Sequence, residues 1–272
     1  MKTILPLCTA AALCVSTASI QAAEETDNRP AKALQDNSFL IEEAYNQEAG
    51  VVQHITTMRR QGRDWFFNFT QEWPIKDETH QFSYTVPYSW LRSDGQRAQG
   101  FGDLMLNYRY QAFMETATMP AVAPRVSLII PTGNAANGLG NGSYGVQALI
   151  PVSKIVSDRV TLHANAGVTS YFDVQGQQPT SYVVGGSVIY AVTREFNLML
   201  EALHEWNESV NDLREIERER GFTISPGFRY AFNLDAGQLV VGLASPIRFA
   251  REKTDYGAFF YLSFEHSFVK KR

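Results

Sequence analysis

Histidine is the residue type in this chain best suited to acid–base or metal chemistry, but its five copies are scattered along the sequence (His54, His80, His163, His204 and His266). None of them has the spacing of metal ligands. His266 and Ser267 are adjacent, so in a strand their side chains point to opposite faces and cannot pair as base and nucleophile. We therefore predict no metal, no cofactor, no catalytic residue and no enzyme activity. An enzyme at the barrel rim, using His266 or His204 with Ser209, is the alternative.

The spacing of three glycines, Gly138, Gly140 and Gly142, resembles that of a phosphate-binding loop. Such a loop needs a helix after it, and none is predicted here, so we expect an external loop. The formal net charge of -4 gives no basic footprint, which argues against nucleic acid as a partner.

Charged residues are the most informative polar groups. Eight of them are predicted to point into a barrel lumen, and they are the candidate pore residues: Glu72, Glu201, Glu205, Glu265, Arg109, Arg125, Arg229 and Arg248. Unpaired ions in a narrow space are costly, so a structural network that fills the lumen is one interpretation. A selective constriction, with Arg109 and Arg125 forming a basic wall on adjacent strands, is the other.

Apolar and polar residues alternate with a period of two, and this alternation determines the direction in which the charged side chains point. Val160, Leu162 and Ala164 alternate with His163 and Asn165, and similar alternation recurs from Trp65 onward. The apolar faces carry aromatic residues at their ends, as a girdle at a membrane interface does, and the opposite faces are polar, as a wet lumen requires. We predict an all-β, antiparallel, up-and-down transmembrane β-barrel.

Twelve strands are predicted, with ten possible because the first is weak: 51–59, 64–73, 79–91, 102–113, 121–131, 143–153, 159–172, 181–192, 196–207, 221–232, 238–249 and 257–268. An even number places both ends in the periplasm. The inner connections are then mostly short and the outer ones mostly longer, as in outer-membrane barrels.

The first 23 of the 272 residues predict a cleaved signal peptide, because a basic start and an apolar stretch precede small residues. Both cysteines, Cys8 and Cys14, lie inside it, so no disulfide is expected in the exported chain. Residues 24–50 form either a flexible periplasmic leader or a plug, with a short helix at 39–47 capped by Ser38. Residues 51–272 form the predicted barrel.

Two signatures carry a family resemblance: Gly100 to Leu104 followed by Asn107 to Tyr110, and Pro131 to Gly133 after an apolar strand. Residues 42–48 and 51–54 add to it. The chain resembles the exported barrel family named for the meta-cleavage pathway of phenol degradation, whose members are often labelled transporters. The resemblance implies an outer-membrane barrel with a tie to aromatic compounds, and brings no catalytic residues.

We thus expect a protein of the bacterial outer membrane that forms a narrow channel for small hydrophobic or aromatic solutes. Inward side chains of Met105, Phe113, Met199 and Leu203 would make this passage partly apolar. The alternative is a non-transporting structural or surface-interaction barrel with a closed lumen. Expected partners are membrane lipid, the barrel-assembly machinery through the terminal strand that ends at Phe268, and lipopolysaccharide through Arg59, Arg60 and Arg63.

Overall fold

The computed structural model describes residues 38–93, 96–251 and 253–268. The chain divides into two compact units, Met1–Ala31 and Lys32–Arg272, and the described residues all belong to the second. The predicted signal peptide and residues 24–37 of the predicted leader lie outside them.

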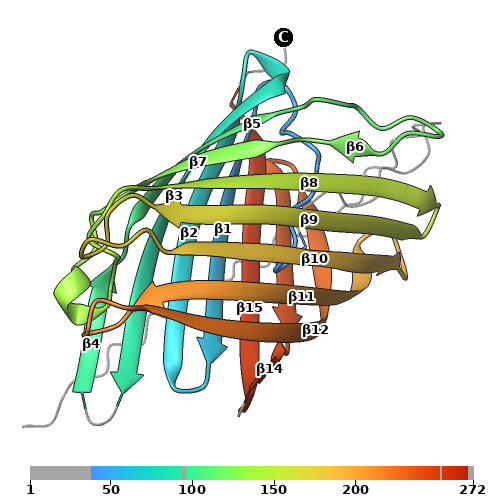
Figure 1. Cartoon of the computed structure of the whole chain (residues 1–272). Coiled ribbons are helices and arrows are strands. Elements are labelled where there is room, and N and C mark those ends of the chain that lie inside the picture. Colours follow the sequence, from blue (N-terminus) through green and yellow to red (C-terminus); the bar gives the residue numbers. More distant parts are fainter. Residues whose placement is uncertain (1–37, 94–95, 252, 269–272) are drawn as a thin grey trace, which may run out of the picture. The chain divides into compact units, whose positions relative to one another are not determined.

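The described strands form one antiparallel sheet that closes into a barrel, because the first strand pairs with the last (Figure 1). Twelve strands lie in order around the wall: β1 (Val51–Gln61), β2 (Asp64–Ile75), β3 (Asp77–Ser93), β5 (Leu104–Tyr110), β7 (Arg125–Ile130), β8 (Gly145–Ser157), β9 (Val160–Tyr171), β10 (Thr180–Ala191), β11 (Phe196–Val210), β12 (Ile216–Leu234), β13 (Gly237–Ala244) and β15 (Thr254–Ser267). Three short strands extend this wall: β4 (Gln96–Phe101), β6 (Ala121–Val122) and β14 (Ile247–Ala250). Closure satisfies the backbone of both edge strands, as a membrane-spanning sheet requires.

Two of the predicted strands are interrupted in the structure, and a third begins later than predicted. The breaks fall at residues 102–103 between β4 and β5, at 123–124 between β6 and β7, and at 245–246 between β13 and β14. Pro124 and Pro246 lie in two of them, and proline has no N–H to donate to a neighbouring strand. The first break follows Gly100, whose φ of +156° favours glycine. The uninterrupted predictions for 121–131 and 238–249 are therefore wrong at these points, and the strand predicted at 102–113 begins at Leu104 instead.

Two of the predicted outer loops are paired strands instead. Strands β3 and β4 stay paired up to Ser93 and Gln96, and β11 and β12 up to Val210 and Ile216. A short turn needs fewer unpaired backbone groups than a long loop, so these connections continue the sheet beyond the predicted strand ends.

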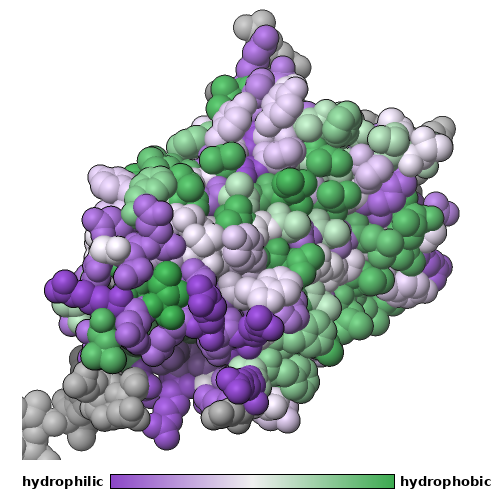
Figure 2. Space-filling model, in the orientation of Figure 1, coloured by the Kyte–Doolittle hydropathy of each residue, from purple (hydrophilic) through white to green (hydrophobic). Residues whose placement is uncertain are grey.

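Alternate residues face two environments. Leu200, Phe228 and Leu262 are 53%, 42% and 43% exposed, although each is a large apolar side chain. Their chain neighbours Glu201, Arg229 and Ser263 are at most 1% exposed. Figure 2 shows hydrophobic side chains over much of the visible wall and hydrophilic ones gathered at the lower left, toward the β11–β12 turn. An apolar outside and a buried polar inside are the arrangement of a barrel surrounded by lipid.

A long apolar helix is another way for a chain to cross a membrane. Within the described residues, no helix is long and apolar enough to cross a bilayer.

Replacing Leu200 with arginine places a charge on the lipid-facing wall. We expect the Leu200→Arg variant to lose about 2–4 kcal/mol of unfolding free energy in lipid vesicles, the cost of a cation near the bilayer midplane. Urea titration of the folded barrel measures it. The control is Leu213→Arg, because Leu213 is 77% exposed in the β11–β12 turn and should tolerate the charge. Equal stability of the two variants would contradict the lipid-facing assignment.

Candidate functional site

The candidate site is the barrel lumen together with residues 38–47, which run through it and are called the lumen segment below. The segment contains no helix, so the predicted helix at 39–47 is wrong. Its backbone N–H groups donate to side chains of the barrel wall instead of to carbonyl groups within a helix: Leu40 and Ile41 to Glu201 (2.7 and 3.2 Å), Glu42 to Asn165 (2.7 Å), Ala44 to Ser153 (2.7 Å), Asn46 to Gln111 (3.1 Å) and Gln47 to Gln81 (2.7 Å). These acceptors lie on or just after β11, β9, β8, β5 and β3. The segment therefore follows the inner wall past several strands before it enters β1.

Arg109 on β5 clamps the middle of the lumen segment. Its guanidinium donates to the backbone oxygens of Glu43 (3.2 Å) and Tyr45 (2.8 Å) and to Oδ1 of Asn46 (2.8 Å). The carboxylate of Glu72 lies 3.9 Å away and supplies the opposite charge. Arg109 is only 3% exposed, so its charge is compensated almost entirely by protein groups.

Arg125 on β7 lies directly opposite Arg109 in the strand register, so the predicted basic wall exists as a juxtaposition. Its Nη2 is 2.9 Å from Oε1 of Glu42 in the lumen segment and 2.6 Å from Oε1 of Gln147. Both arginines are thus bonded to the segment and to wall residues, which favours the network interpretation over a bare charged filter.

Phe39 anchors the start of the lumen segment in an apolar cluster. Its ring stacks on Phe259 of β15 and is tilted against Tyr261 of the same strand, with both centroid distances 5.3 Å. A Cβ atom at Gly242 of β13 would lie 2.3 Å from Cζ of Phe39. The Phe39 ring therefore fits against this inward position only because residue 242 is a glycine. The wall sequence is therefore matched to the segment.

Tyr45 and Glu115 tie the segment to the connection that follows β5. The Tyr45 hydroxyl donates a hydrogen bond to the Glu115 carboxylate, which also accepts from Nζ of Lys154 (2.9 Å) and from the Ile155 N–H (2.9 Å). Burial acts to raise the pKa of Glu115, but these hydrogen bonds and the charge of Lys154 outweigh it and hold the pKa below its usual 4.5. Burial and the bond to Glu115 raise the pKa of the Tyr45 hydroxyl, so Tyr45 remains a donor.

Beyond the lumen segment the barrel contains a partly open cavity of about 740 Å³. The segment supplies part of its lining through Phe39, Leu40 and Ile41, and Leu203 and Tyr261 add apolar wall. Asparagine, threonine and charged side chains make up its polar lining. The segment lies at the barrel end where β1 begins and β15 ends. Apart from the connection between β5 and β7, the turns there are short, as is typical of the periplasmic end of such barrels.

The other predicted pore residues also lie within the barrel. Glu201 and Arg229 are fully buried, and Glu205 and Arg248 lie 4.0 Å apart in the outer part of the lumen. Glu265 is partly buried, in register with the buried Gln53 near the periplasmic end. Their role in selecting solutes stays a prediction.

Two other orientation predictions are wrong. Phe113, expected to line the lumen, is 57% exposed: β5 ends at Tyr110, and Phe113 instead forms an isolated bridge with Val122 of β6. Arg59, Arg60 and Arg63 do not form one external cluster: Arg59 lines the cavity, whereas Arg60 lies over Trp65 on the opposite face of β1. Alternation along β1 separates these two neighbours.

The lumen segment is the functional element that sequence reasoning placed least well. Polar inward positions such as Asn165, Ser153 and Gln81 were visible as a pattern, but nothing local showed that they accept backbone N–H groups from residues 38–47. The glycine at 242 was a usable signal, because an inward glycine in a strand marks the close approach of another group.

Metal binding has no preformed site in the part of the chain that the structure describes. No three His, Cys, Asp or Glu side chains gather there as ligands.

The family model described as "Putative MetA-pathway of phenol degradation" matches residues 40–264. No curated protein sequence matches. Among solved structures, an outer membrane channel from Pseudomonas putida F1 is similar, with a TM-score of 0.62 and 14% identity over 83% of this chain and 98% of that one. The KdgM porin has a TM-score of 0.48 and 10% identity, covering 80% and 99%. The CymD monoaromatic hydrocarbon channel has a TM-score of 0.41 and 9% identity, covering 83% and 90%.

The likeness to the Pseudomonas channel and the closed sheet confirm the predicted all-β transmembrane barrel of twelve strands. The apolar outer wall of this closed barrel agrees with the predicted location in the bacterial outer membrane.

Replacing Arg109 removes the clamp on the lumen segment. In Arg109→Met, two backbone carbonyl groups lose a buried donor and Glu72 loses the opposite charge, so we expect the unfolding free energy to fall by about 3–5 kcal/mol. We also expect a higher single-channel conductance, because residues 43–46 are freed. Arg194→Met is the control, since Arg194 is exposed in the β10–β11 turn. An unchanged conductance in a folded Arg109 variant would contradict the clamp.

Acidification tests the Tyr45–Glu115 anchor. Because the pKa of Glu115 is lowered in the folded barrel, its stabilising effect is complete above its ordinary pKa of 4.5 and is lost as the pH falls through the lowered value. We expect planar-bilayer conductance to rise in that acidic range, and Tyr45→Phe to raise it already at neutral pH.

The controls for this anchor are Glu115→Gln and Tyr144→Phe. Glu115→Gln should remove the acid-dependent rise, and Tyr144→Phe should behave as the unmodified protein, because Tyr144 is 53% exposed. A rise that persists unchanged in Glu115→Gln would assign it to another group.

Proposed function

The chain belongs to the MetA-pathway of phenol degradation family, and from this premise we propose that it is a narrow conduit through the outer membrane for small hydrophobic or aromatic solutes. The observation that carries the proposal is the cavity of about 740 Å³ beyond the lumen segment. This volume lies in the range of pockets that hold small molecules.

The lining supports an apolar solute. Phe39, Ile41, Leu203 and Tyr261 give the cavity an apolar surface beside its polar groups. A barrel of twelve strands lies between filled barrels of eight and the wide channels of sixteen or more, so its passage is narrow. The family description supplies the link to aromatic compounds.

The lumen segment is the proposed barrier on the periplasmic side. Glu201, Asn165, Arg109 and Arg125 hold it by hydrogen bonds and an ion pair. These interactions are polar and individually modest, so a solute can pass if part of the segment moves. The buried charges then act mainly as positioning groups for the segment.

A closed-lumen, non-transporting barrel is the second candidate. One observation favours it: the lumen segment is hydrogen-bonded to the barrel wall at several positions between Leu40 and Gln47. Such a barrel would pass no solute whether the segment is free or fixed.

Further partners are also proposals. Lipid surrounds the apolar wall, and lipopolysaccharide phosphate could contact Arg60 and Arg63 at the first outer turn, but not the inward Arg59. The alternating terminal strand β15 is the proposed signal for the barrel-assembly machinery.

A cysteine pair tests whether passage requires movement of the segment. Ser38 Oγ and Ser187 Oγ lie 2.7 Å apart, so cysteines at both positions are placed to form a disulfide between the segment and β10. Both natural cysteines, Cys8 and Cys14, lie in the predicted signal peptide. In the double variant we expect uptake of benzyl alcohol and toluene into liposomes to fall on oxidation and return on reduction.

The single variants Ser38→Cys and Ser187→Cys are the controls and should not respond to oxidation. No uptake by the unmodified or the reduced barrel, each verified as folded by its shift on an unheated gel, would support the closed-lumen candidate instead.

A further inference from the structure

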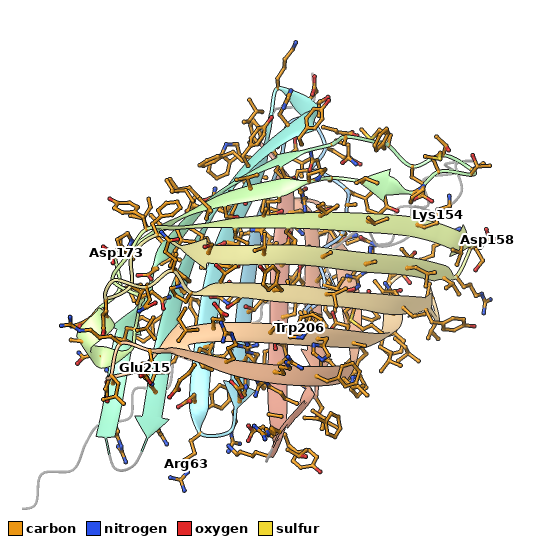
Figure 3. The ribbon with its side chains drawn as sticks, in the orientation of Figure 1. Arg63, Lys154, Asp158, Asp173, Trp206 and Glu215 are labelled. Carbon is orange, nitrogen blue, oxygen red and sulfur yellow. The ribbon has the colours of Figure 1, made fainter. Side chains whose placement is uncertain are left out.

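Arg59 is a cation of the outer lumen that takes no part in the hydrogen-bond network around the lumen segment. It lies on β1 in register with Phe66 of β2 and Phe259 of β15, and it lines the cavity beside Thr57 and Ile55. In Figure 3 the nearby Arg63 points away from the barrel at the β1–β2 turn. Arg59 therefore faces the space that the solute would occupy, whereas Arg63 faces the surroundings.

The guanidinium of Arg59 has no hydrogen bond or ion pair with any residue the structure describes. The ring of Phe66 lies beside it, 5.1 Å from Cζ to the centroid. By contrast, Arg109 and Arg125 are hydrogen-bonded to the segment and the wall, and Arg248 is 2.9 Å from Glu219. Arginine keeps its charge and carries five donors in a planar fork. Arg59 thus presents a charged bidentate donor to the cavity.

The acidic residues of the cavity are mostly engaged elsewhere. Glu42 pairs with Arg125 (2.9 Å), Glu72 accepts from Gln81 (2.9 Å), and Glu208 binds Arg218 (2.8 Å). Glu205 acts on Arg59 electrostatically, but beyond ion-pair distance, and it is 4.0 Å from Arg248. These carboxylates disfavour a dianion such as phosphate, while a single negative charge can be held by Arg59.

The surroundings of Arg59 also fit an apolar body. Leu40 and Leu203 line the same cavity of about 740 Å³ as Arg59, and Phe39 and Tyr261 continue its apolar lining toward the segment. A ligand with one charged end and a hydrophobic remainder would meet both kinds of surface at once.

We propose that Arg59 binds the carboxylate of a monoanionic apolar solute, of the class of small aromatic carboxylic acids, in the outer lumen. This inference rests on the proposed conduit and names the solute class for which it is built. Arg59 holds the carboxylate by paired N–H···O bonds, and the aromatic body lies against the leucine and aromatic lining.

The test measures equilibrium binding by calorimetry with the barrel in lipid nanodiscs, so that it does not depend on passage. The probes are benzoate, its neutral analogue benzamide and the cation benzylammonium. We expect benzoate to bind more tightly than both, and Arg59→Gln to weaken benzoate by about tenfold or more with little change for benzamide, since a charge-assisted bidentate contact is lost. Arg59→Lys should recover part of the loss, because it keeps the charge without the fork.

Arg63→Gln is the matched control, because it removes the same charge four residues along the chain from an exposed side chain. Benzoate affinity that is absent, or equal in Arg59→Gln and the unmodified barrel, would overturn the proposal. An equal loss in Arg63→Gln would overturn it too, since it would reveal a general surface potential. The liposome uptake of toluene is read separately, so failure of the conduit and failure of the anion site give different results.

Discussion

Backbone hydrogen bonding across the seam between β1 and β15 is the constraint on which the rest of the structure depends. A strand edge open to hydrocarbon would leave N–H and C=O groups without partners, at several kcal/mol each. The continuous register from Val51 with Ser267 to Gln61 with Gly257 removes that edge. Once the sheet is closed, each strand has an apolar side in lipid and a polar side in an enclosed lumen.

The enclosed lumen creates a second requirement, because buried polar side chains need partners as much as the backbone does. The lumen segment meets it. Its backbone donors bond to Glu201 and Asn165, and its carbonyl groups accept from Arg109. Wall and segment satisfy each other, and the cavity that remains is bounded by groups of both kinds.

The sequence patterns that depend on neighbouring residues predicted most of the wall. Alternation placed Leu200 in lipid and Glu201 in the lumen, and the buried Glu72, Arg109 and Arg229 also lie within the barrel. The helix expected at 39–47 failed for a physical reason. Ile41, Ala44 and Tyr45 have helical spacing, but acceptors on distant strands bind the backbone donors that a helix would have used. The strand breaks at Pro124 and Pro246 were readable, since proline cannot donate to a ladder.

What the amino-acid order determined alone is which solvent each side chain of the wall meets, because that depends only on a local period of two. What the tertiary structure decided is which luminal groups meet one another. Arg109 and Arg59 are both inward arginines in the sequence, yet closure of the barrel brings the lumen segment onto the first and leaves the second facing the cavity. Such pairings join residues far apart in the chain through strand register and barrel curvature, and no local pattern encodes them.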